Sequence, residues 1–375
     1  MTFEEWRQQM PVTQLWAYFD HAAVAPLPAP AARVIQFYAE SYQANGIAVI
    51  QDWVDRIREV RRLAGKLVNA DPHDLAFVPS TTMGISIVAE GYPFQPGENI
   101  VSVADEYPSN QYPWMNLRDR GVEFRAVPTV QGRVDLDALF GAVNDKTRLL
   151  TISSVEYATG FRNDLAKIGE FCQLRNIFFF VDTIQSLGVS PLDVQQLPLD
   201  AFAADGHKWL LGPEGAGLLY LKRKWIENFR PIGVGWNSVV DNLNFGKIDF
   251  RLKPHVGRWE GGTTNMVGLT ALGESIRLLL DVGIVKIEQK LESLTDRLCE
   301  ALTGIGWSIY SSRQPGEKSA IVSISKDGVD PLELQKRCRD AGVIVNVRGG
   351  RLRISAHGYN TWSEMEVLLE ILRKY

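Results

Sequence analysis

The sequence contains few cysteines and histidines. Its 375 residues include 3 Cys and 5 His. The cysteines, Cys172, Cys299 and Cys338, are far apart and odd in number, so they give no disulfide framework and favour a reducing compartment. The histidines lack the spacing of metal ligands, so no metal is expected. These shortages predict a cytoplasmic protein without a zinc centre.

Long apolar runs and an excess of one charge are also missing. No run approaches the roughly 18 apolar residues of a membrane helix. Met1 is followed by Thr-Phe-Glu-Glu-Trp, which has neither the basic start nor the apolar stretch of a signal peptide. The 40 basic and 44 acidic residues give a net charge of −4, spread without long runs. Binding to nucleic acid or to an anionic membrane is therefore not expected.

The middle of the chain alternates short apolar runs with stretches of helical periodicity. This alternation is typical of an α/β fold, a mostly parallel sheet with helices on both faces. We predict helices at 82–90 and 109–120 and one that begins near 165 and ends before 177. Strands are predicted at 74–78, 99–103, 122–127, 149–155, 177–181, 201–204 and 216–221.

The pattern changes after about residue 271. A long amphipathic stretch, 271–303, is followed by predicted helices at 331–341 and 361–373 and by predicted strands at 307–312, 319–325, 343–347 and 351–355. This part predicts a smaller α+β domain. The expected organisation is an N-terminal arm (1–20) that packs with the small domain, a large domain (21–270), and a linker helix with the small domain (271–375).

Lys208 and Asp182 are the most informative residues. Each follows a short apolar run that predicts a buried parallel strand, and ligands of open α/β sheets bind at strand ends. A lysine and an acid at neighbouring strand ends suit pyridoxal 5′-phosphate. Its aldehyde forms a Schiff base with an amine, and its pyridine nitrogen needs an anion to stay protonated. Either residue alone could instead be an ordinary surface or turn residue.

Other polar residues follow the same strand ends. Ser80-Thr81-Thr82-Met83-Gly84 lies where a strand enters a helix, which suits a phosphate, although one hydroxyl could be only a helix cap. His207 could donate to the same phosphate. Gln185 lies three residues after Asp182 and would share its face if the segment were helical, so it could reach the cofactor ring.

Three further side chains suit the ring or the substrate. Tyr107 follows the predicted strand at 99–103 and could stack on a planar cofactor. Arg351 and Arg353 alternate on one predicted strand, and a guanidinium is the usual partner of a substrate carboxylate. A surface tyrosine and surface ion pairs are the alternatives.

With these residues assembled, the chain resembles the class V aminotransferases of the fold type I pyridoxal-phosphate enzymes, which include cysteine desulfurases and isopenicillin N epimerase. The resemblance covers nearly the whole chain. It is carried by Phe19-Asp20-His21-Ala22-Ala23, Ser80-Thr81-Thr82, Val181-Asp182-Thr183-Ile184-Gln185-Ser186, Gly206-His207-Lys208, Glu260-Gly261-Gly262-Thr263-Thr264-Asn265 and Arg353-Ile354-Ser355.

The resemblance implies a role for each matching residue. It implies that Lys208 forms the Schiff base, Asp182 pairs with the ring nitrogen, and Gln185 contacts the ring O3′. It also implies that Thr81, Thr82 and His207 bind the phosphate, and that Arg353 takes the substrate α-carboxylate. Thr263 is implied to reach the phosphate of a neighbouring subunit, which implies a homodimer.

Four departures from the family pattern stand out. Tyr107 replaces the stacking histidine of desulfurases, Tyr157 replaces an asparagine beside O3′, and Asp205 replaces a phosphate-binding serine. An aspartate would turn away, bind through its backbone N–H, or pair with a cation. Desulfurases also carry a nucleophilic cysteine on a loop before the carboxylate-binding arginine, and residues 346–353 have neither a cysteine nor room for that loop.

The sequence therefore predicts an enzyme acting on an amino acid, with transamination, which also needs a keto acid, as the leading reaction. A lyase or epimerase using the same cofactor is the first alternative. A non-catalytic pyridoxal-phosphate binder is the second, but it would not need Arg353.

Overall fold

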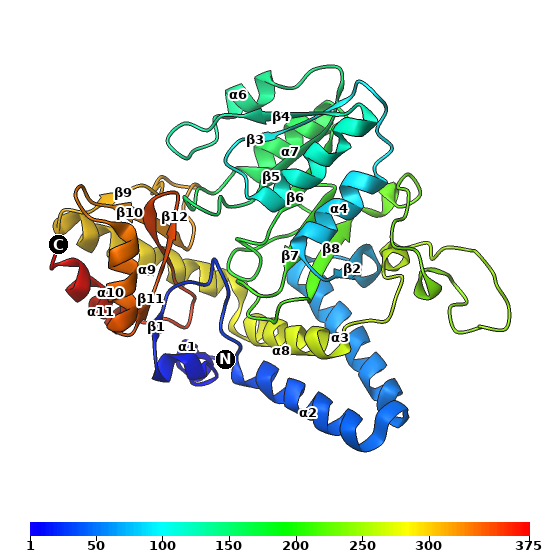
Figure 1. Ribbon diagram of the computed structural model, residues 1–375, viewed down its shortest axis with the longest axis horizontal. Helices are drawn as coiled ribbons and strands as arrows, with labels where there is room; N and C mark the ends of the chain where they lie inside the picture. The colour runs from blue at the N-terminus through cyan, green and yellow to red at the C-terminus, as the bar shows by residue number, and fades with distance from the viewer.

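A seven-stranded sheet forms the centre of the larger part of the molecule in the computed structural model, which describes residues 1–375 (Figure 1). The strands, in spatial order, are β2 (Leu75–Val78), β8 (Gly217–Leu221), β7 (Ala201–Asp205), β6 (Phe178–Asp182), β5 (Thr147–Ser153), β3 (Asn99–Val103) and β4 (Glu123–Val127). Only β8 runs antiparallel to its neighbours. The predicted α/β fold with a mostly parallel sheet is confirmed.

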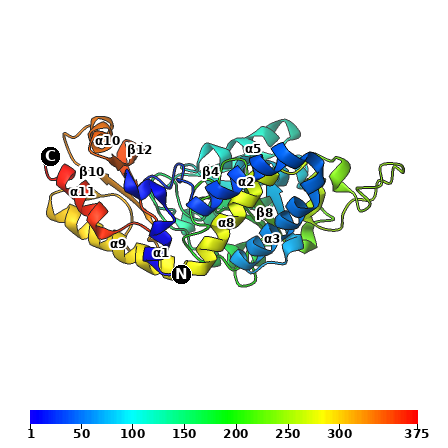
Figure 2. The ribbon, with the colours of Figure 1, turned by 90° about the horizontal axis from the view of Figure 1, so that it is seen from below.

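Both faces of this sheet are buried, because side chains of a strand alternate between them. Phe178 and Phe180 pack in one apolar cluster with residues of α4 (Thr81–Gly91) and with Trp114 of α5 (Tyr112–Met115). Phe179 and Val181 pack in the other cluster. That cluster includes residues of α3 (Ile50–Val68), α7 (Leu165–Leu174) and α8 (Met266–Val282), and α2 (Ala29–Asn45) lies against α3 and α8 (Figures 1 and 2).

A smaller antiparallel sheet lies at the other end of the molecule (Figure 1). Its strands, in spatial order, are β12 (Asn346–Arg348), β13 (Arg351–Ser355), β10 (Ile321–Ser325) and β9 (Ser308–Ile309). Three helices pack with it: α9 (Ile284–Gly304), α10 (Pro331–Asp340) and α11 (Trp362–Leu372). The remaining helices are short: α1 (Phe3–Gln8), α6 (Leu136–Gly141), η1 (Pro11–Gln14), η2 (Gly46–Val49), η3 (Pro72–Asp74), η4 (Pro108–Asn110), η5 (Asn116–Arg120), η6 (Arg223–Trp225), η7 (Trp236–Ser238) and η8 (Val256–Trp259).

The N-terminal segment lies beside the small sheet, although it is the part of the chain farthest from it in sequence. Strand β1 (Ala17–Tyr18) pairs in parallel with β11 (Val343–Ile344), and Asp20 forms an isolated bridge with Ser355 at the end of β13. Figure 1 shows this blue segment next to the orange and red strands. The domain boundaries at residues 20 and 270 stay a prediction.

Several elements differ from the sequence expectation. The helix expected at 109–120 is broken into η4, α5 and η5, since Pro113 has no N–H to continue a helix from 109. The long stretch 271–303 is two helices, α8 and α9, separated by Gly283 with a φ of 96°. The strand expected at 307–312 is only the two-residue β9, and the one at 343–347 divides between two sheets as β11 and β12.

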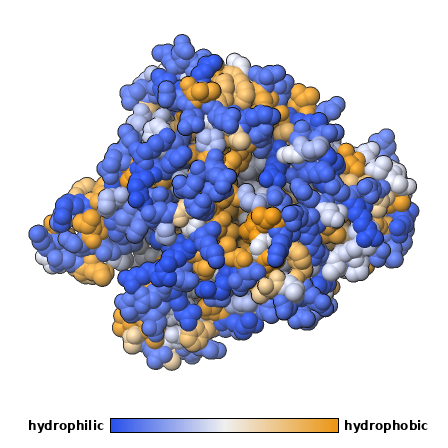
Figure 3. Space-filling model, turned by 180° about the vertical axis from the view of Figure 1, so that it is seen from behind, coloured by the Kyte–Doolittle hydropathy of each residue, from blue (hydrophilic) through white to orange (hydrophobic).

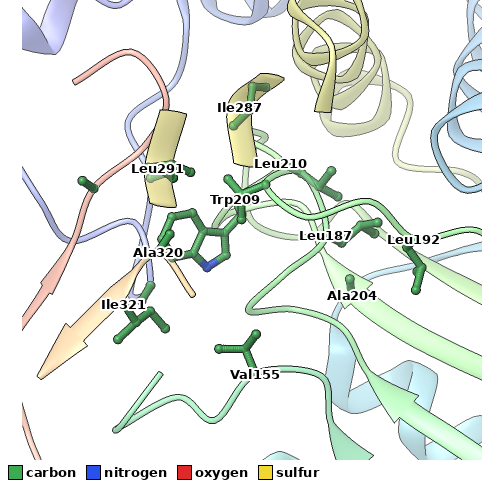
Figure 4. Packing of buried hydrophobic residues seen from close by; sticks show 14 of the residues in the cluster. Val155, Leu187, Leu192, Ala204, Trp209, Leu210, Ile287, Leu291, Ala320 and Ile321 are labelled. Atoms are coloured by element: carbon green, nitrogen blue, oxygen red, sulfur yellow. The ribbon is translucent and has the colours of Figure 1, made fainter. Parts of the chain in front are cut away.

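The residue after Lys208 anchors the large sheet to the small domain. Trp209 is fully buried, and Figure 4 shows its indole ring between Leu187 and Leu210 on one side and side chains of α9 and β10 on the other. Those side chains are Ile287, Leu291, Ala320 and Ile321. The backbone that carries Lys208 is therefore fixed from both domains.

The surface is mostly hydrophilic, as the face in Figure 3 shows. The segment 234–250 is an exception, because most of its large apolar side chains are exposed: Trp236, Val234, Val240, Leu243, Phe245, Ile248 and Phe250. No helix is both long and apolar enough to cross a membrane.

Close packing of α4 on β7 gives a test of the fold. A Cβ at Gly84 would lie 2.6 Å from the Cβ of Ala203, so Gly84→Ala must push the helix away from the strand. Overpacking of this kind costs about 1–3 kcal/mol. We expect Gly84→Ala to lower the free energy of unfolding by that amount in denaturant titrations.

Gly304→Ala is the matched control, since this glycine is also helical and has no atom within 4 Å of the added Cβ. It should leave stability unchanged or raise it by about 0.5–1 kcal/mol. Equal stability of Gly84→Ala and the wild-type protein would contradict the close packing.

Candidate active site

A cavity of about 380 Å³ opens where β6 and β7 end and α4 begins. Apart from Thr263 and Arg351, every residue predicted to bind the cofactor or the substrate lines it: Thr81, Thr82, Tyr107, Tyr157, Asp182, Gln185, Asp205, His207, Lys208 and Arg353. Thr263 is exposed and lies outside this cavity. The parallel strands thus bring together side chains from distant parts of the chain.

Asp182 and Lys208 are both buried in this cavity, with exposed fractions of 2% and 8%. Burial raises the pKa of Asp182 to about 6, although the Ile184 N–H (3.0 Å from Oδ1) and the charge of Lys208 lower it. Burial lowers the pKa of Lys208 to about 8, while Asp182 opposes that change. At about pH 7 the Lys208 amine is therefore unprotonated more often than the amine of an ordinary lysine. A nucleophile or a base must be unprotonated to act.

The start of α4 forms one wall of the cavity. Ser80 caps the helix by accepting from the Met83 N–H (3.1 Å), and the Thr81 Oγ1 accepts from the Asp205 N–H (2.9 Å). The Thr82 hydroxyl donates to Ser109 (2.8 Å). The first turn of a helix leaves N–H groups without intrahelical partners, so this wall can receive a phosphate.

His207 and Asp205 lie beside this helix end. The Asp205 Oδ1 accepts from the Gly206 N–H at 2.7 Å, which turns the carboxylate onto its own backbone. Its Oδ2 lies 2.9 Å from the His207 Nδ1, but the two atoms lack the alignment of a hydrogen bond, so Nδ1 has no hydrogen-bonding partner. An orphaned ring nitrogen next to a helix N-terminus fits a phosphate that has yet to bind.

Gln185 reaches the cavity from a turn and not from the helix that its spacing suggested. The Ser186 and Leu187 N–H groups both donate to the Thr183 carbonyl, and no helix follows β6. The Gln185 Oε1 accepts from the Trp209 indole N–H (2.9 Å), and Nε2 donates to the Ala22 carbonyl (3.1 Å). One N–H of the amide has no protein partner and can donate to a ring oxygen.

Arg353 is almost fully buried, at 1% exposure. Its Nη2 donates to Asp20 (3.1 Å) and its Nη1 to the Tyr157 carbonyl (2.9 Å), while Nε has no partner. Arg351 does not share this position, because its guanidinium stacks 3.4 Å from the centroid of the Tyr310 ring. Asp20, which the sequence indicated only as part of a motif, therefore holds the arginine that is expected to bind the substrate.

The two tyrosines lie near each other at the cavity wall. Their ring centroids are 5.2 Å apart at an interplanar angle of 75°. The Lys208 Nζ lies 5.5 Å from the centroid of the Tyr107 ring, which is 44% exposed. Tyr107 is thus placed to cover a planar ligand attached at Lys208.

Two buried carboxyl groups near Asp182, those of Glu106 and Glu156, were not predicted from the sequence. Glu106 accepts from the Ser153 N–H and hydroxyl, and Ser153 is the register partner of Asp182. Glu156 accepts from the Asn163 amide at 2.8 Å, and its second oxygen has no partner. Burial, with the nearby carboxylates, raises the pKa of Glu106 to about 7 and that of Glu156 further. No periodicity singles out these acids, because each stands in a loop after a strand.

Comparison with known proteins agrees with this site. The family model described as aminotransferase class-V matches residues 17–367. A probable cysteine desulfurase from Methanothermobacter thermautotrophicus is 30% identical over 397 residues, covering 100% of this chain and 98% of that protein. The apo structure of a cysteine desulfurase from Thermococcus onnurineus NA1 superposes with a TM-score of 0.90 at 25% identity, covering 99% of this chain and 97% of that one.

A second solved structure that is similar to this chain is a C-DES variant with glycine covalently linked to its pyridoxal-phosphate cofactor. Its TM-score is 0.93 at 23% identity, covering 98% of this chain and 99% of that one, which shows a shared fold. The fold is that of the fold type I pyridoxal-phosphate enzymes. The chain belongs to the class V aminotransferase family, and pyridoxal 5′-phosphate is its cofactor.

The buried carboxyl groups predict how stability depends on pH. A carboxyl whose folded-state pKa is raised stabilises the fold fully below its unfolded pKa of about 4.3, and this stabilisation is lost as pH rises through the folded value. Burial lowers the pKa values of His255 and His357 to about 4, so these two groups make the free energy of unfolding of the cofactor-free protein rise with pH up to about 6.5. The contribution of Glu106 has the opposite sign, and up to about 3 kcal/mol of it should be lost between about pH 4.3 and 7.

Glu106→Gln should remove this loss, because the amide keeps the shape and cannot ionise. Glu170→Gln on the exposed surface of α7 is the control and should follow the wild-type curve. The measurement is the urea midpoint of cofactor-free protein at a series of pH values. A Glu106→Gln curve parallel to the wild-type curve would show that Glu106 is already ionised in the folded protein.

Proposed function

We propose that this protein is a pyridoxal-phosphate-dependent aminotransferase that acts on an α-amino acid. The observation that carries the proposal is the convergence of Lys208, Asp182 and Arg353 on one cavity that no cysteine lines. A base, an anion and a carboxylate-binding group are the set that reaction at an amino-acid Cα requires. A non-catalytic binder of the cofactor would have no use for the buried Arg353.

Each residue has a distinct part in binding the cofactor and the substrate. Thr81, Thr82, His207 and the N-terminus of α4 would hold the phosphate, and Gln185 would donate to the ring oxygen. Asp182 would face the ring nitrogen, and Tyr107 would cover the ring near Lys208. Arg353 offers its unpartnered Nε–H to the α-carboxylate, with Asp20 fixing its orientation.

Lys208 is the proposed base. When bound, the cofactor withdraws electrons from the substrate Cα and so acidifies its proton. The lowered pKa of Lys208 leaves a larger fraction of its amine neutral than in an ordinary lysine, so Nζ can take the Cα proton and return it on the same face. Asp182 stays anionic opposite a protonated ring nitrogen, because that cation favours the charged carboxylate.

The cavity lacks the cysteine thiol that persulfide chemistry needs as its nucleophile. Cys172, Cys299 and Cys338 are buried in α7, α9 and α10, away from the cavity. Burial raises the pKa of Cys299 and Cys338 to about 11 and that of Cys172 further, which disfavours each thiolate. The turn before Arg353 is only Gly349 and Gly350. We therefore separate this protein from desulfurases that transfer sulfur to a cysteine.

A lyase is the second candidate. The curated relative named above as a probable cysteine desulfurase suggests a substrate with sulfur on Cβ. The same Lys208 could take the Cα proton while the Cβ–S bond breaks, so that the sulfur leaves as a thiolate or sulfide and no protein thiol is needed as acceptor. An epimerase also shares the first proton transfer, although it needs a second proton donor on the opposite face.

A cytoplasmic homodimer completes the proposal. Thr263 lies outside the cavity of its own chain, and the nearby segment 234–250 exposes many apolar side chains. Large exposed apolar patches are typical of interaction sites, and a second copy would cover this one. The three free, buried cysteines suit a reducing compartment.

A panel of amino acids tests the reaction. The holoenzyme should convert its cofactor to pyridoxamine phosphate when one amino acid is added without a keto acid, and a keto acid should reverse the change. The measurement is the visible absorbance together with identification of the released keto acid. Lys208→Ala should abolish the conversion, because no other amine lines the cavity.

Release of ammonia with an unchanged cofactor would move the protein to the lyases. Exchange of the Cα proton with inversion and no keto acid would move it to the epimerases. Unchanged spectra and no product with any amino acid would contradict an enzymatic role.

The cysteines give an independent prediction. A variant with all three cysteines changed to alanine should keep its amino-acid activity, although its stability should fall because buried side chains are shortened. Wild-type protein incubated with L-cysteine should show no persulfide by thiol labelling and mass spectrometry. Stoichiometric persulfide on one cysteine, lost when that residue is replaced, would overturn this reading.

A further inference from the structure

A second guanidinium, that of Arg348, lines the same cavity as Arg353. The hairpin of β12 and β13 explains its position. Asn346 is the register partner of Arg353, and Arg348 follows two residues later on the same face of the strand. Gly349 and Gly350, with φ values of 55° and 72°, form the two-residue turn that keeps the strands in this register.

Arg348 forms no direct ion pair, although its charge acts on the nearby Asp20 carboxylate. Its Nη1 donates to the Asn346 side chain and to the Val347 carbonyl, both at 2.9 Å. No carboxylate oxygen lies within 4.0 Å of it, and its Nε and Nη2 form no hydrogen bond with the protein. Arg353, in contrast, is paired with Asp20. Arg348 is therefore a half-buried cation with free donors facing a binding cavity.

Asn346 holds Arg348 in this orientation. Its side-chain oxygen accepts from Arg348, and its amide donates to the Asp20 Oδ2 at 2.6 Å. Asp20 in turn accepts from Arg353. One hydrogen-bonded chain thus fixes both guanidinium groups relative to each other, as recognition of a ligand with two separated anionic groups requires.

The two arginines hold different partners. They are related diagonally across the antiparallel strands, a separation of about 7–8 Å that long side chains can span. Arg353 is held by Asp20 and the Tyr157 carbonyl. Arg348 is held by Asn346, so the two guanidinium groups offer donors from two positions. With the α-carboxylate on Arg353, as the proposed function requires, the free donors of Arg348 face the substrate side chain. We infer that Arg348 binds an anionic group on that side chain, so that the enzyme selects amino acids with an acidic side chain.

A comparison of acidic amino acids with their neutral amides tests this inference. Aspartate and glutamate differ from asparagine and glutamine in charge but hardly in shape. Cysteine sulfinate extends the set to another oxyanion. Wild-type enzyme should prefer the acids, and Arg348→Gln should lower kcat/KM for them by about 10- to 100-fold, since hydrogen bonds to charged groups contribute about 1.5–3 kcal/mol. For the amides, kcat/KM should change by less than about threefold.

Arg348→Lys should restore part of the preference, because the charge returns without the planar fork. Arg351→Gln is the matched control, since Arg351 is an arginine of the same hairpin outside the cavity. It should behave like the wild-type enzyme.

Binding without turnover gives a second readout. Succinate and propionate differ by one carboxylate, and each can be titrated into the holoenzyme while the visible absorbance is followed. Succinate should bind at least about tenfold more tightly to the wild-type enzyme than to Arg348→Gln. Propionate should bind both proteins equally.

The outcomes separate this inference from the proposed function. An equal loss for acids and amides would show that Arg348 binds the α-carboxylate, and no loss for either would show that it does not contact the substrate. A wild-type preference for amides would also overturn the inference. If no amino acid reacts, the proposed function fails, and the succinate titration still decides whether Arg348 recognises a second carboxylate.

Discussion

The site depends on two charged side chains, Asp182 and Lys208, that are buried at the ends of strands with apolar residues on both faces. Asp182 ends β6, whose register pairs it with Ala203 of β7, and Lys208 follows β7 by one turn. Burial disfavours the charged form of each, so the pKa of the acid rises and that of the amine falls. A cofactor that places a cationic ring nitrogen at Asp182 and an aldehyde at Lys208 relieves both penalties. Cofactor binding and folding are therefore coupled through the same two groups.

The small domain completes the site through Asp20. This residue stands at the end of the N-terminal segment, bridges to Ser355 of β13, and accepts hydrogen bonds from Arg353 and Asn346. Arg353 and Arg348 are thus tied to the segment that enters the large domain, and Ala22 and Ala23 from that segment line the cavity. Trp209 connects the two domains from the other side, because its ring packs on α9 and β10 while its N–H holds Gln185. Movement of the small domain would therefore shift the substrate site and the cofactor site together.

The sequence predicted the centre of the molecule well, because its strands are uninterrupted apolar runs that end in polar residues. Phe178 to Asp182 and Ala201 to Asp205 are examples. Breaks within helices were not predicted. The apolar periodicity suggested continuous helices at 109–120 and 271–303, but Pro113 and Gly283 divide them. Helices α2 and α3 drew no prediction, although α3 buries Trp53, Val60, Ala64 and Leu67 at helical spacing.

Site residues that belong to a sequence motif were predicted. Site residues that only tertiary packing brings to the cavity were not. Asp182, Lys208 and Arg353 follow strands or stand in motifs, and all of them line the cavity. Arg348 was missed because its position depends on the hairpin turn at Gly349 and Gly350. Glu106 and Glu156 were missed because only tertiary contacts bury them.

The identity of the lysine that bonds to the cofactor is the central claim, and borohydride reduction of the holoenzyme tests it most directly. Reduction fixes the cofactor to its lysine, and peptide mapping identifies that residue. Lys290 is a demanding competitor, because its pKa is also lowered to about 8, yet its amine lies over the Phe3 ring outside the cavity. The account predicts a single modified peptide that contains Lys208. A modification at Lys290 or any other lysine, or none at all, would contradict it.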